Sequence, residues 1–425
     1  MSTTLIEDRG TLLTNAGELR RQIEEVVNTT AVADMHTHLF APQFGQMALF
    51  GIDELLSYHY LIAETFRAIE LSPQRFWKMT RAEHADLVWK TLFVDNTPLS
   101  EAACGVVTVL DAFGLDTRAP DLEEAREFFR SRNVQAHVDF VLESACVGSV
   151  VMTNDPFDER EARVWETGID IDSRFHASLR IDQLVNDWPS AAAKLASMGY
   201  RVDATTTEES ASEVRKFLDS CIARLKPLYI VVSLPDDFRY PAADDRTWVI
   251  REAVLPAARE HGLAFGLMVG VRRGVNPTLR AAGDGVGKAD VRAIERLCGE
   301  NGDVRFLATF LSRENQHELC VSARTFSNLM PFGCWWFLNN PSQVSEITRQ
   351  RIEMLGTTFI PQHSDARILE QLIYKWRHAR RVIVEAFCES YEKLLASGRA
   401  VSRPEIERDV QAMFSGNFYR WIRAE

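Results

Sequence analysis

Short apolar runs recur along the chain, and each ends in polar or ligand-type residues. Each run has a core of about four to eight apolar residues with β-branched or aromatic content, which is typical of a buried strand. Between the later runs, apolar positions keep the 3, 4 spacing of one helix face, as Val214, Phe217, Leu218 and Cys221 do. The predicted strands are residues 31–36, 147–155, 175–182, 228–235, 263–270, 304–312, 329–337 and 357–365.

A strand alternating with a helix about eight times is the signature of an α/β fold of the (β/α)8 TIM-barrel type. A doubly wound open sheet is the alternative, but it needs a Gly-rich turn after its first strand, and HTHLFAP at 36–42 is unlike one. We therefore expect one barrel domain over residues 1–425.

One long segment, residues 40–146, interrupts the alternation after the first predicted strand. It has helical patterns, including a Thr80…Glu83 capping box at the start of TRAEHADLVWKTLF. We expect this segment to be a helical insertion that covers the active-site end of the barrel.

Composition narrows the functional classes. The chain has 425 residues, 46% of them hydrophobic and 25% charged, which excludes disorder, collagen and coiled coil. Its net charge of −12, with no run of Lys or Arg, argues against nucleic acid and anionic membranes as partners. Glu7 and Asp8 stand where a signal peptide would be apolar, and seven scattered cysteines form no CxxC pair. We expect a cytoplasmic protein with reduced thiols.

The strongest chemical signal is Asp34-Met35-His36-Thr37-His38, at the end of the first predicted strand. Positions i and i+2 of a strand point to the same side, so His36 and His38 can face one point. Imidazole is the usual ligand for ions such as Zn, Fe or Mn. Two structural histidines are the alternative, but active sites of this fold lie at the C-terminal ends of the strands, which favours metal binding.

A second signal is Gln362-His363-Ser364-Asp365-Ala366-Arg367, at the end of the eighth run. In a closed barrel the eighth strand neighbours the first, so Asp365 can reach a metal that the first strand holds. A salt bridge at a strand end is the alternative for Asp365 and Arg367 alone.

Histidines are missing where a two-metal hydrolase would place them. The predicted strands that end near Pro235, Gly270 and Ser312 carry no His there, and His317 comes a few residues later. This absence indicates a mononuclear site with open positions for substrate.

These residues belong to longer motifs, and the chain resembles the uronate isomerases of the amidohydrolase superfamily over essentially its whole length. The motifs are DMHTHLF, ELLSYHY, VVMTNDPFD, LSRENQHEL, GCWWFLNNP and FIPQHSDAR. The resemblance implies a (β/α)8 barrel that interconverts glucuronate with fructuronate, or galacturonate with tagaturonate.

The resemblance also implies site residues. The family's first-strand HxH falls on His36 and His38, and its eighth-strand D-x-R falls on Asp365 and Arg367. Its His-Tyr pair falls on His59 and Tyr60, and its Arg after an early strand matches Arg180.

Other candidates keep two interpretations. Alone, His59 and Tyr60 suit an aromatic helix patch. With the resemblance, a position in a lid is favoured. Arg180 can clamp a carboxylate bidentately, whereas for Arg313 a structural ion pair is equally open. We assign Trp335, at the end of the seventh predicted strand, to the substrate, although alternation turns one of Trp335 and Trp336 away. His137 is expected at the surface.

The leading hypothesis is an aldose–ketose isomerase of open-chain hexuronates in carbohydrate metabolism. Moving a proton between C2 and C1 through an enediol needs a cation at the C1 and C2 oxygens and a placed base. We expect one divalent metal ion on His36, His38 and Asp365, with zinc first and manganese or iron as alternatives.

Asp365 is also expected to take a proton from a substrate hydroxyl. Tyr60, oriented by His59, is the candidate for the transfer between C2 and C1, and Arg180 and Arg367 would hold the carboxylate and hydroxyls.

Two rival functions are a mononuclear metal-dependent hydrolase of a lactone or amide, and a non-catalytic protein that binds sugar acids. The missing histidines argue against the hydrolase, and a ligand set with open positions argues against the binder. A small-molecule hexuronate is the expected partner, with no nucleic acid and no membrane. We also expect a homo-oligomer.

Overall fold

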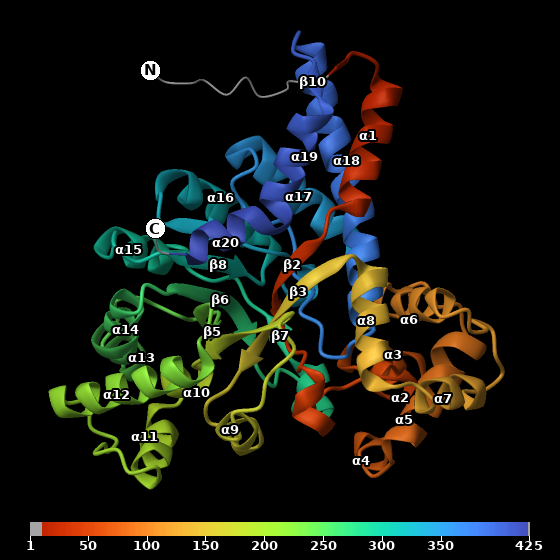
Figure 1. Ribbon diagram of the computed structural model, residues 1–425. Helices are drawn as coiled ribbons and strands as arrows, with labels where there is room; N and C mark the ends of the chain where they lie inside the picture. The colour runs from red at the N-terminus through yellow and green to blue at the C-terminus, as the bar shows by residue number, and fades with distance from the viewer. Residues whose placement is uncertain (1–10, 424–425) are drawn as a thin grey trace.

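The computed structural model describes residues 11–423, and its centre is a curled parallel sheet (Figure 1). Seven strands follow the order β2-β3-β4-β5-β6-β8-β9 with parallel neighbours throughout, while β7 pairs with β6 in the antiparallel sense. The bounds are β1 (Leu12–Leu13), β2 (Val32–Thr37), β3 (Val147–Asn154), β4 (Phe175–Arg180), β5 (Tyr229–Pro235), β6 (Ala264–Arg272), β7 (Gly285–Val286), β8 (Phe306–Phe310), β9 (Leu329–Pro331) and β10 (Val401–Ser402).

The sheet is parallel and its strands are buried on both faces. Every residue of β2 and of β8 is buried. Helices follow the strands as crossovers, so one face of each strand meets a helix and the other meets the interior of the curl. The predicted mixed α/β class with a parallel sheet is confirmed, and the first six apolar runs of the sequence are strands of this sheet.

Two predicted strands differ from the structure. The seventh is only β9, which ends at Pro331 instead of continuing to residue 337. The eighth, 357–365, makes a single parallel bridge between Ile360 and Phe332. Pro361 has no N–H for a ladder, and Asp365 turns the backbone with a left-handed φ of 52°. Regular strand geometry therefore ends at both places before the polar residues begin.

The segment after Ile360 nevertheless meets β2. The Asp365 N–H donates to the His36 carbonyl at 3.2 Å, and the His38 N–H donates to the Ala366 carbonyl at 2.7 Å. These two hydrogen bonds, with the bridge to Phe332, place residues 360–366 between the two end strands of the curl.

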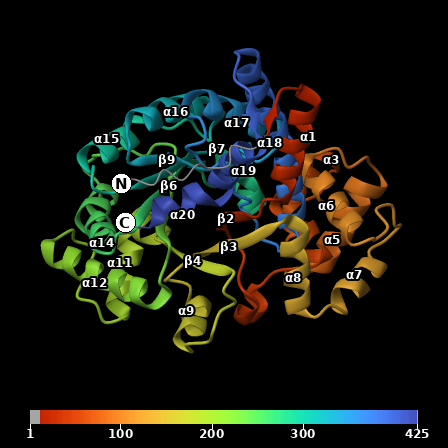
Figure 2. The same ribbon diagram turned by 45° about the horizontal axis from the view of Figure 1, so that its top comes forward.

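Helices in the second half lie outside the sheet, where Figure 2 shows them in an arc. Thr207 caps the longest of the crossover helices, α12, by accepting the Ser210 N–H. Their bounds are α9 (Glu159–Glu166), α10 (Asp182–Asn186), α11 (Trp188–Ser197), α12 (Glu208–Leu225), α13 (Asp245–Val249), η3 (Ile250–Val254), α14 (Leu255–Glu260), η4 (Pro277–Gly283), α15 (Arg292–Glu300), η5 (Arg313–Asn315), α16 (Gln316–Thr325), η6 (Trp336–Leu338) and α17 (Pro341–Leu355).

Between β2 and β3 the chain is helical, and Figure 1 shows these helices together on one side of the sheet. The expected capping box is present, because Thr80 accepts the Glu83 N–H while Glu83 accepts the Thr80 N–H. These helices have a buried apolar cluster of their own, with Leu56, Trp89 and Val106 among its members. Their bounds are η1 (Pro42–Met47), α2 (Ile52–Leu56), α3 (His59–Ala68), α4 (Pro73–Phe76), α5 (Arg81–Trp89), η2 (Lys90–Val94), α6 (Glu101–Ala112), α7 (Glu123–Arg130) and α8 (Val134–Ala145).

Segments near the beginning and the end of the described chain pack together. β1 pairs with β10 in the antiparallel sense, and α1 packs on the long helix α18, as Figure 1 shows. All seven cysteines are free. No helix within residues 11–423 combines the length and apolar content needed to cross a bilayer. The bounds of these helices are α1 (Ala16–Thr29), α18 (Gln371–Ala396), α19 (Arg403–Gln411), η7 (Ala412–Gly416) and α20 (Asn417–Ile422).

Candidate active site

Three predicted ligands converge at the C-terminal end of β2. The side chains of His36, His38 and Asp365 each offer a ligand atom, and these atoms lie within 4.8 Å of one another. His38 Nε2 is 3.3 Å and His36 Nε2 is 3.8 Å from Asp365 Oδ1. Across residues 11–423, this is the one such group of His, Cys, Asp and Glu side chains.

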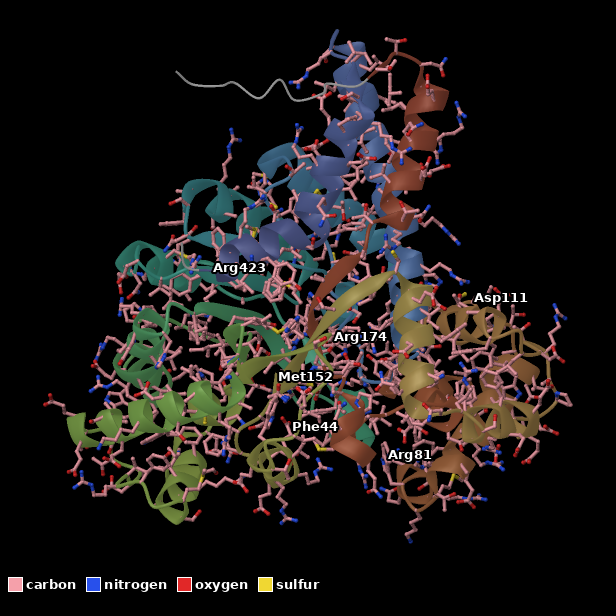
Figure 3. The ribbon with its side chains drawn as sticks, in the orientation of Figure 1. Phe44, Arg81, Asp111, Met152, Arg174 and Arg423 are labelled. Atoms are coloured by element: carbon pink, nitrogen blue, oxygen red, sulfur yellow. The ribbon has the colours of Figure 1, made fainter. Side chains whose placement is uncertain are left out.

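The position of this group follows from strand pairing. Thr37, between the two histidines, pairs with Met152 of β3, which Figure 3 labels near the centre of the molecule. Asp365 arrives from the other side of β2. The Asp34 carboxylate accepts the Ser364 N–H at 3.0 Å and the Trp376 indole N–H at 2.8 Å, and so fixes the backbone just before Asp365.

The Tyr229 hydroxyl sets the tautomer of His36. The Tyr229 hydroxyl donates to the Met35 carbonyl at 2.6 Å, so its oxygen is left to accept the N–H of His36 Nδ1 at 3.1 Å. His36 Nε2 then carries the lone pair and faces Asp365. A ligating histidine usually donates its other ring N–H in this way.

Protonation states also suit metal ligands. Burial lowers the pKa of His36 to about 3 and that of His38 to about 4, so both imidazoles are neutral near pH 7. Burial raises the pKa of Asp365, but the contact with His38 and the charge of Arg367 outweigh it and hold that pKa well below its usual range. Neutral imidazoles and an ionised carboxylate are the forms that bind a divalent cation.

A metal ion therefore fits this group. Asp365 Oδ1 is buried and has no hydrogen-bond partner in the described part of the chain. A buried anionic oxygen without a donor is costly, and a cation beside it would remove that cost. The coarse prediction of a metal-type site is supported, while the donor set suits several metals.

A cavity of about 800 Å³ carries other predicted residues. His59, Arg180 and Arg367 line it, together with Trp336. Trp335 is buried but does not line the cavity. The backbone leaves the strand at Pro331 and Trp336 has a left-handed φ of 47°, so strand alternation does not apply to this pair.

His59 and Tyr60 open helix α3, and of the two His59 lines the cavity. Burial raises the pKa of Tyr60 well above its usual value, and Tyr58 adds to this, so the phenol is protonated near neutral pH. Burial, and next the charge of Arg367, lower the pKa of His59 to about 3. His59 Nε2 and the Tyr60 hydroxyl are buried without a hydrogen-bond partner among the described residues. Both polar atoms thus have unused hydrogen-bonding capacity within the described part of the chain.

The two cavity arginines differ in their environment. Arg180, at the end of β4, donates from Nε and Nη2 to Asp182 at 2.9 and 2.5 Å. Arg367 has a buried Nε that lacks a partner within residues 11–423. Arg313, the other candidate clamp, is exposed and pairs with Glu346 at 3.0 Å, which is the structural alternative.

The cavity is also lined by charged residues that the sequence analysis did not single out. Asp236 and Asp237 follow β5 in LPDD, and Arg272 and Arg273 stand at the end of β6 in VRR, where charges directly after apolar runs could have revealed them. Arg246 reaches the cavity from α13.

The predicted surface position of His137 is wrong. Instead of lying at the surface, it is fully buried and pairs with Glu370 at 2.7 Å. The prediction failed because a lone His on a helix carries no sign of a partner 233 residues away.

The curled parallel sheet, the buried His-His-Asp group and the cavity at the same end of the strands define a mixed α/β protein, consistent with a TIM-like fold, with a possible metal site. No family model and no curated protein matches the chain. Solved structures do match. A uronate isomerase from Bacillus halodurans C-125 is 48% identical, with a TM-score of 0.95, over 96% of this chain and 97% of that one. The chain belongs to the uronate isomerase family, as its motifs indicated.

Two more distant structures share the fold. A uronate isomerase from Thermotoga maritima is 15% identical, with a TM-score of 0.77, over 99% of this chain and 100% of that one. A glucuronate isomerase from Caulobacter crescentus is 15% identical, with a TM-score of 0.74, over 99% and 97% of the two chains.

Proposed function

We propose that this protein is a uronate isomerase, which converts D-glucuronate to D-fructuronate and D-galacturonate to D-tagaturonate. The observation that carries the proposal is the 48% identity, over nearly the whole of both chains, to a solved uronate isomerase. The cavity adds chemical support, because it places Arg180, Arg367 and His59 together.

His36, His38 and Asp365 would hold one divalent ion, for which we propose zinc ahead of manganese or iron. When bound, the ion supplies a Lewis acid that stabilises negative charge on the C1 and C2 oxygens during proton transfer.

The chain's own groups move the protons. The ionised Asp365 carboxylate accepts the proton of a substrate hydroxyl. Tyr60 rests as the phenol because burial raises its pKa, so it first releases its own proton to solvent, and the resulting phenolate takes the C2 proton and returns it to C1. The charge of Arg367 lowers the same pKa and so stabilises the phenolate. His59 stacks edge-to-face with Tyr60, at 4.7 Å between ring centroids, and orients it.

Two arginines that line the cavity, Arg180 and Arg367, would bind the substrate. Arg180 and Arg367 pair with the carboxylate and hydroxyls of the open-chain sugar acid, since guanidinium forks match carboxylates. Trp336 contacts the substrate in place of Trp335, which we had expected there, because Trp336 is the Trp that lines the cavity.

We further propose that residues 1–425 form one (β/α)8 barrel, in which 357–365 takes the eighth position and 40–146 is an insertion over the active-site end. Two contacts support this cover: Trp77 donates its indole N–H to the Thr278 carbonyl at 2.8 Å, and the Arg280 guanidinium lies 4.3 Å from the Trp77 ring centroid. We also propose that the protein is cytoplasmic and forms a homo-oligomer. Light scattering of the purified protein measures the mass of the assembly and so tests the oligomeric state.

The test is ketose formation from a panel of uronates, with metal content measured on the same preparation. One metal equivalent and ketose from glucuronate or galacturonate are expected. In deuterium oxide the ketose should carry deuterium at C1 but below full exchange, because a covered site returns part of the same proton. Cleavage of a lactone with the C2 hydrogen untouched in every uronate would instead establish the hydrolase.

A further inference from the structure

His137 and Glu370 form a pair that lies outside the cavity and is completely buried. His137 Nε2 is 2.7 Å from Glu370 Oε1, and both side chains have no exposed surface. The Gly51 N–H donates to the same oxygen at 2.9 Å. One carboxylate oxygen thus joins α8, the residues before α2 and the residue just before α18.

This pair holds the short loop that carries Arg367. A backbone bond runs parallel to it, from the Leu369 N–H to the Leu49 carbonyl at 3.0 Å. On the other side, the Arg367 N–H donates to Gln371 Oε1 at 2.8 Å. The loop between Asp365 and α18 is therefore fixed to the helical segment 40–146 through Glu370.

The pair sits in an aromatic enclosure. The rings of Phe50, Phe113 and Phe129 lie 5.4, 5.4 and 5.7 Å from the His137 ring, centroid to centroid. Glu370 Oε2 is also buried and has no partner among residues 11–423, so Oε1 carries both donors of this carboxylate. Apolar walls make the loss of either donor costly, which favours the one loop position that keeps both donors on Oε1. Such a pair specifies geometry more than it adds stability.

We propose that His137 and Glu370 are positioning residues of the isomerase reaction: they set the place of Arg367 and register the helical segment 40–146 against the barrel. The proposal rests on the proposed function for its kinetic part. Neither residue lines the cavity, and Asp365 is tied to β2 by separate backbone bonds. Loss of the pair therefore disturbs substrate handling and leaves the His36, His38 and Asp365 group intact.

The chain offers a matched control. His378 Nδ1 lies 2.6 Å from Glu101 Oε1, so a second His–Glu pair joins α18 to α6 of the same helical segment. None of the hydrogen bonds of that pair within the described residues reaches residues 366–370. If the loss of turnover came from a general loosening of the segment, breaking either pair would produce it, whereas displacement of Arg367 should follow only from breaking the first.

The experiment compares Glu370→Ala, Glu370→Gln and Glu101→Ala with the wild type. For each, kcat and KM for D-glucuronate are measured with metal content, and hydrogen–deuterium exchange is followed in peptides covering 46–56 and 366–372. We expect Glu370→Ala to lower kcat/KM by about ten- to a hundred-fold, since a displacement of about 1 Å at an orienting group has that effect. Its metal content should be unchanged, and both peptides should exchange faster.

Glu370→Gln should restore kcat/KM to within a few-fold, because the amide oxygen still accepts from Gly51 and His137. Glu101→Ala should leave kcat/KM and both peptides as in the wild type. If Glu370→Ala does not fold, His137→Phe, which keeps an aromatic ring in the enclosure, takes its place with the same expectations.

Two results would overturn the proposal. One is wild-type kcat/KM and wild-type exchange in Glu370→Ala or His137→Phe. The other is an equal loss in Glu101→Ala, which would make the effect a general loosening. If the wild type itself forms no ketose, the proposed function fails, while the exchange measurement still decides whether Glu370 holds the loop.

Discussion

Replacing Tyr229 with Phe would remove a single oxygen behind the metal-type site. That oxygen is fully buried and lies between the Met35 carbonyl at 2.6 Å and His36 Nδ1 at 3.1 Å. The substitution keeps the ring, so packing in the sheet interior is preserved. What changes is the direction and tautomer of His36, which no longer has an acceptor for its Nδ1 proton.

The magnitude follows from these two contacts. A buried N–H left without a partner costs about 1–3 kcal/mol, so the metal-free protein should lose about that much stability. Deleting the hydrogen-bond partner of a metal-ligating histidine typically weakens metal affinity about 10- to 100-fold. That factor corresponds to about 1.4–2.8 kcal/mol of binding free energy.

Metal affinity would be measured by titrating the metal-free protein with Zn²⁺ against a coloured chelator of known affinity, and stability by urea unfolding. Tyr391→Phe is the matched control, because its buried hydroxyl donates to Asp409 at 2.8 Å away from the site. The control should lose stability but keep zinc affinity. Unchanged zinc affinity in Tyr229→Phe would refute the assignment of His36 as a ligand oriented by Tyr229.

Three further outcomes are expected. His36→Ala and His38→Ala should each lose bound metal and turnover together with the fold retained by circular dichroism, and a variant with full metal and full turnover would contradict the ligand assignment. Arg367→Lys should lower kcat/KM about ten- to a hundred-fold or more, because an ammonium cannot replace one or two charge-assisted bonds of about 1.5–3 kcal/mol each; near wild-type efficiency would mean a structural ion-pair role. Burial raises the pKa of Glu161 to about 8 from 4.5, so its stabilising contribution is complete below about pH 4.5 and lost as pH rises through about 8. Glu161→Gln should therefore flatten the fall of Tm between pH 5 and 8 in calorimetry, and an unchanged slope would argue against a protonated Glu161.

The two histidines of the metal-type group were readable from the sequence because their signal is local. A buried run ending in Asp34-Met35-His36-Thr37-His38 fixes both the strand and the shared direction of its i and i+2 side chains. Asp365 was found by a topological argument, that the eighth position neighbours the first. In the structure, residues 365 and 366 lie beside β2 through backbone hydrogen bonds to His36 and His38, although they form no regular strand.

Other features were beyond local patterns. Alternation along a strand cannot tell which of Trp335 and Trp336 faces the cavity, because the strand has already ended at Pro331. The burial of His137 depends on Glu370 and on three phenylalanines brought together by tertiary packing. The left-handed turn at Asp365 likewise has no signature in the letters around it, since the surrounding backbone imposes it.

The hydrogen bond between Asp34 and the Ser364 N–H joins residues 330 positions apart. During synthesis at about 5–20 residues per second, the histidines next to Asp34 are added to the chain roughly 15–65 s before Asp365. Throughout that interval the nascent chain holds only two of the three candidate ligands. A site that needs His36, His38 and Asp365 together can therefore form only late in translation, and a ribosome that stalls before residue 365 releases a product without the third side chain.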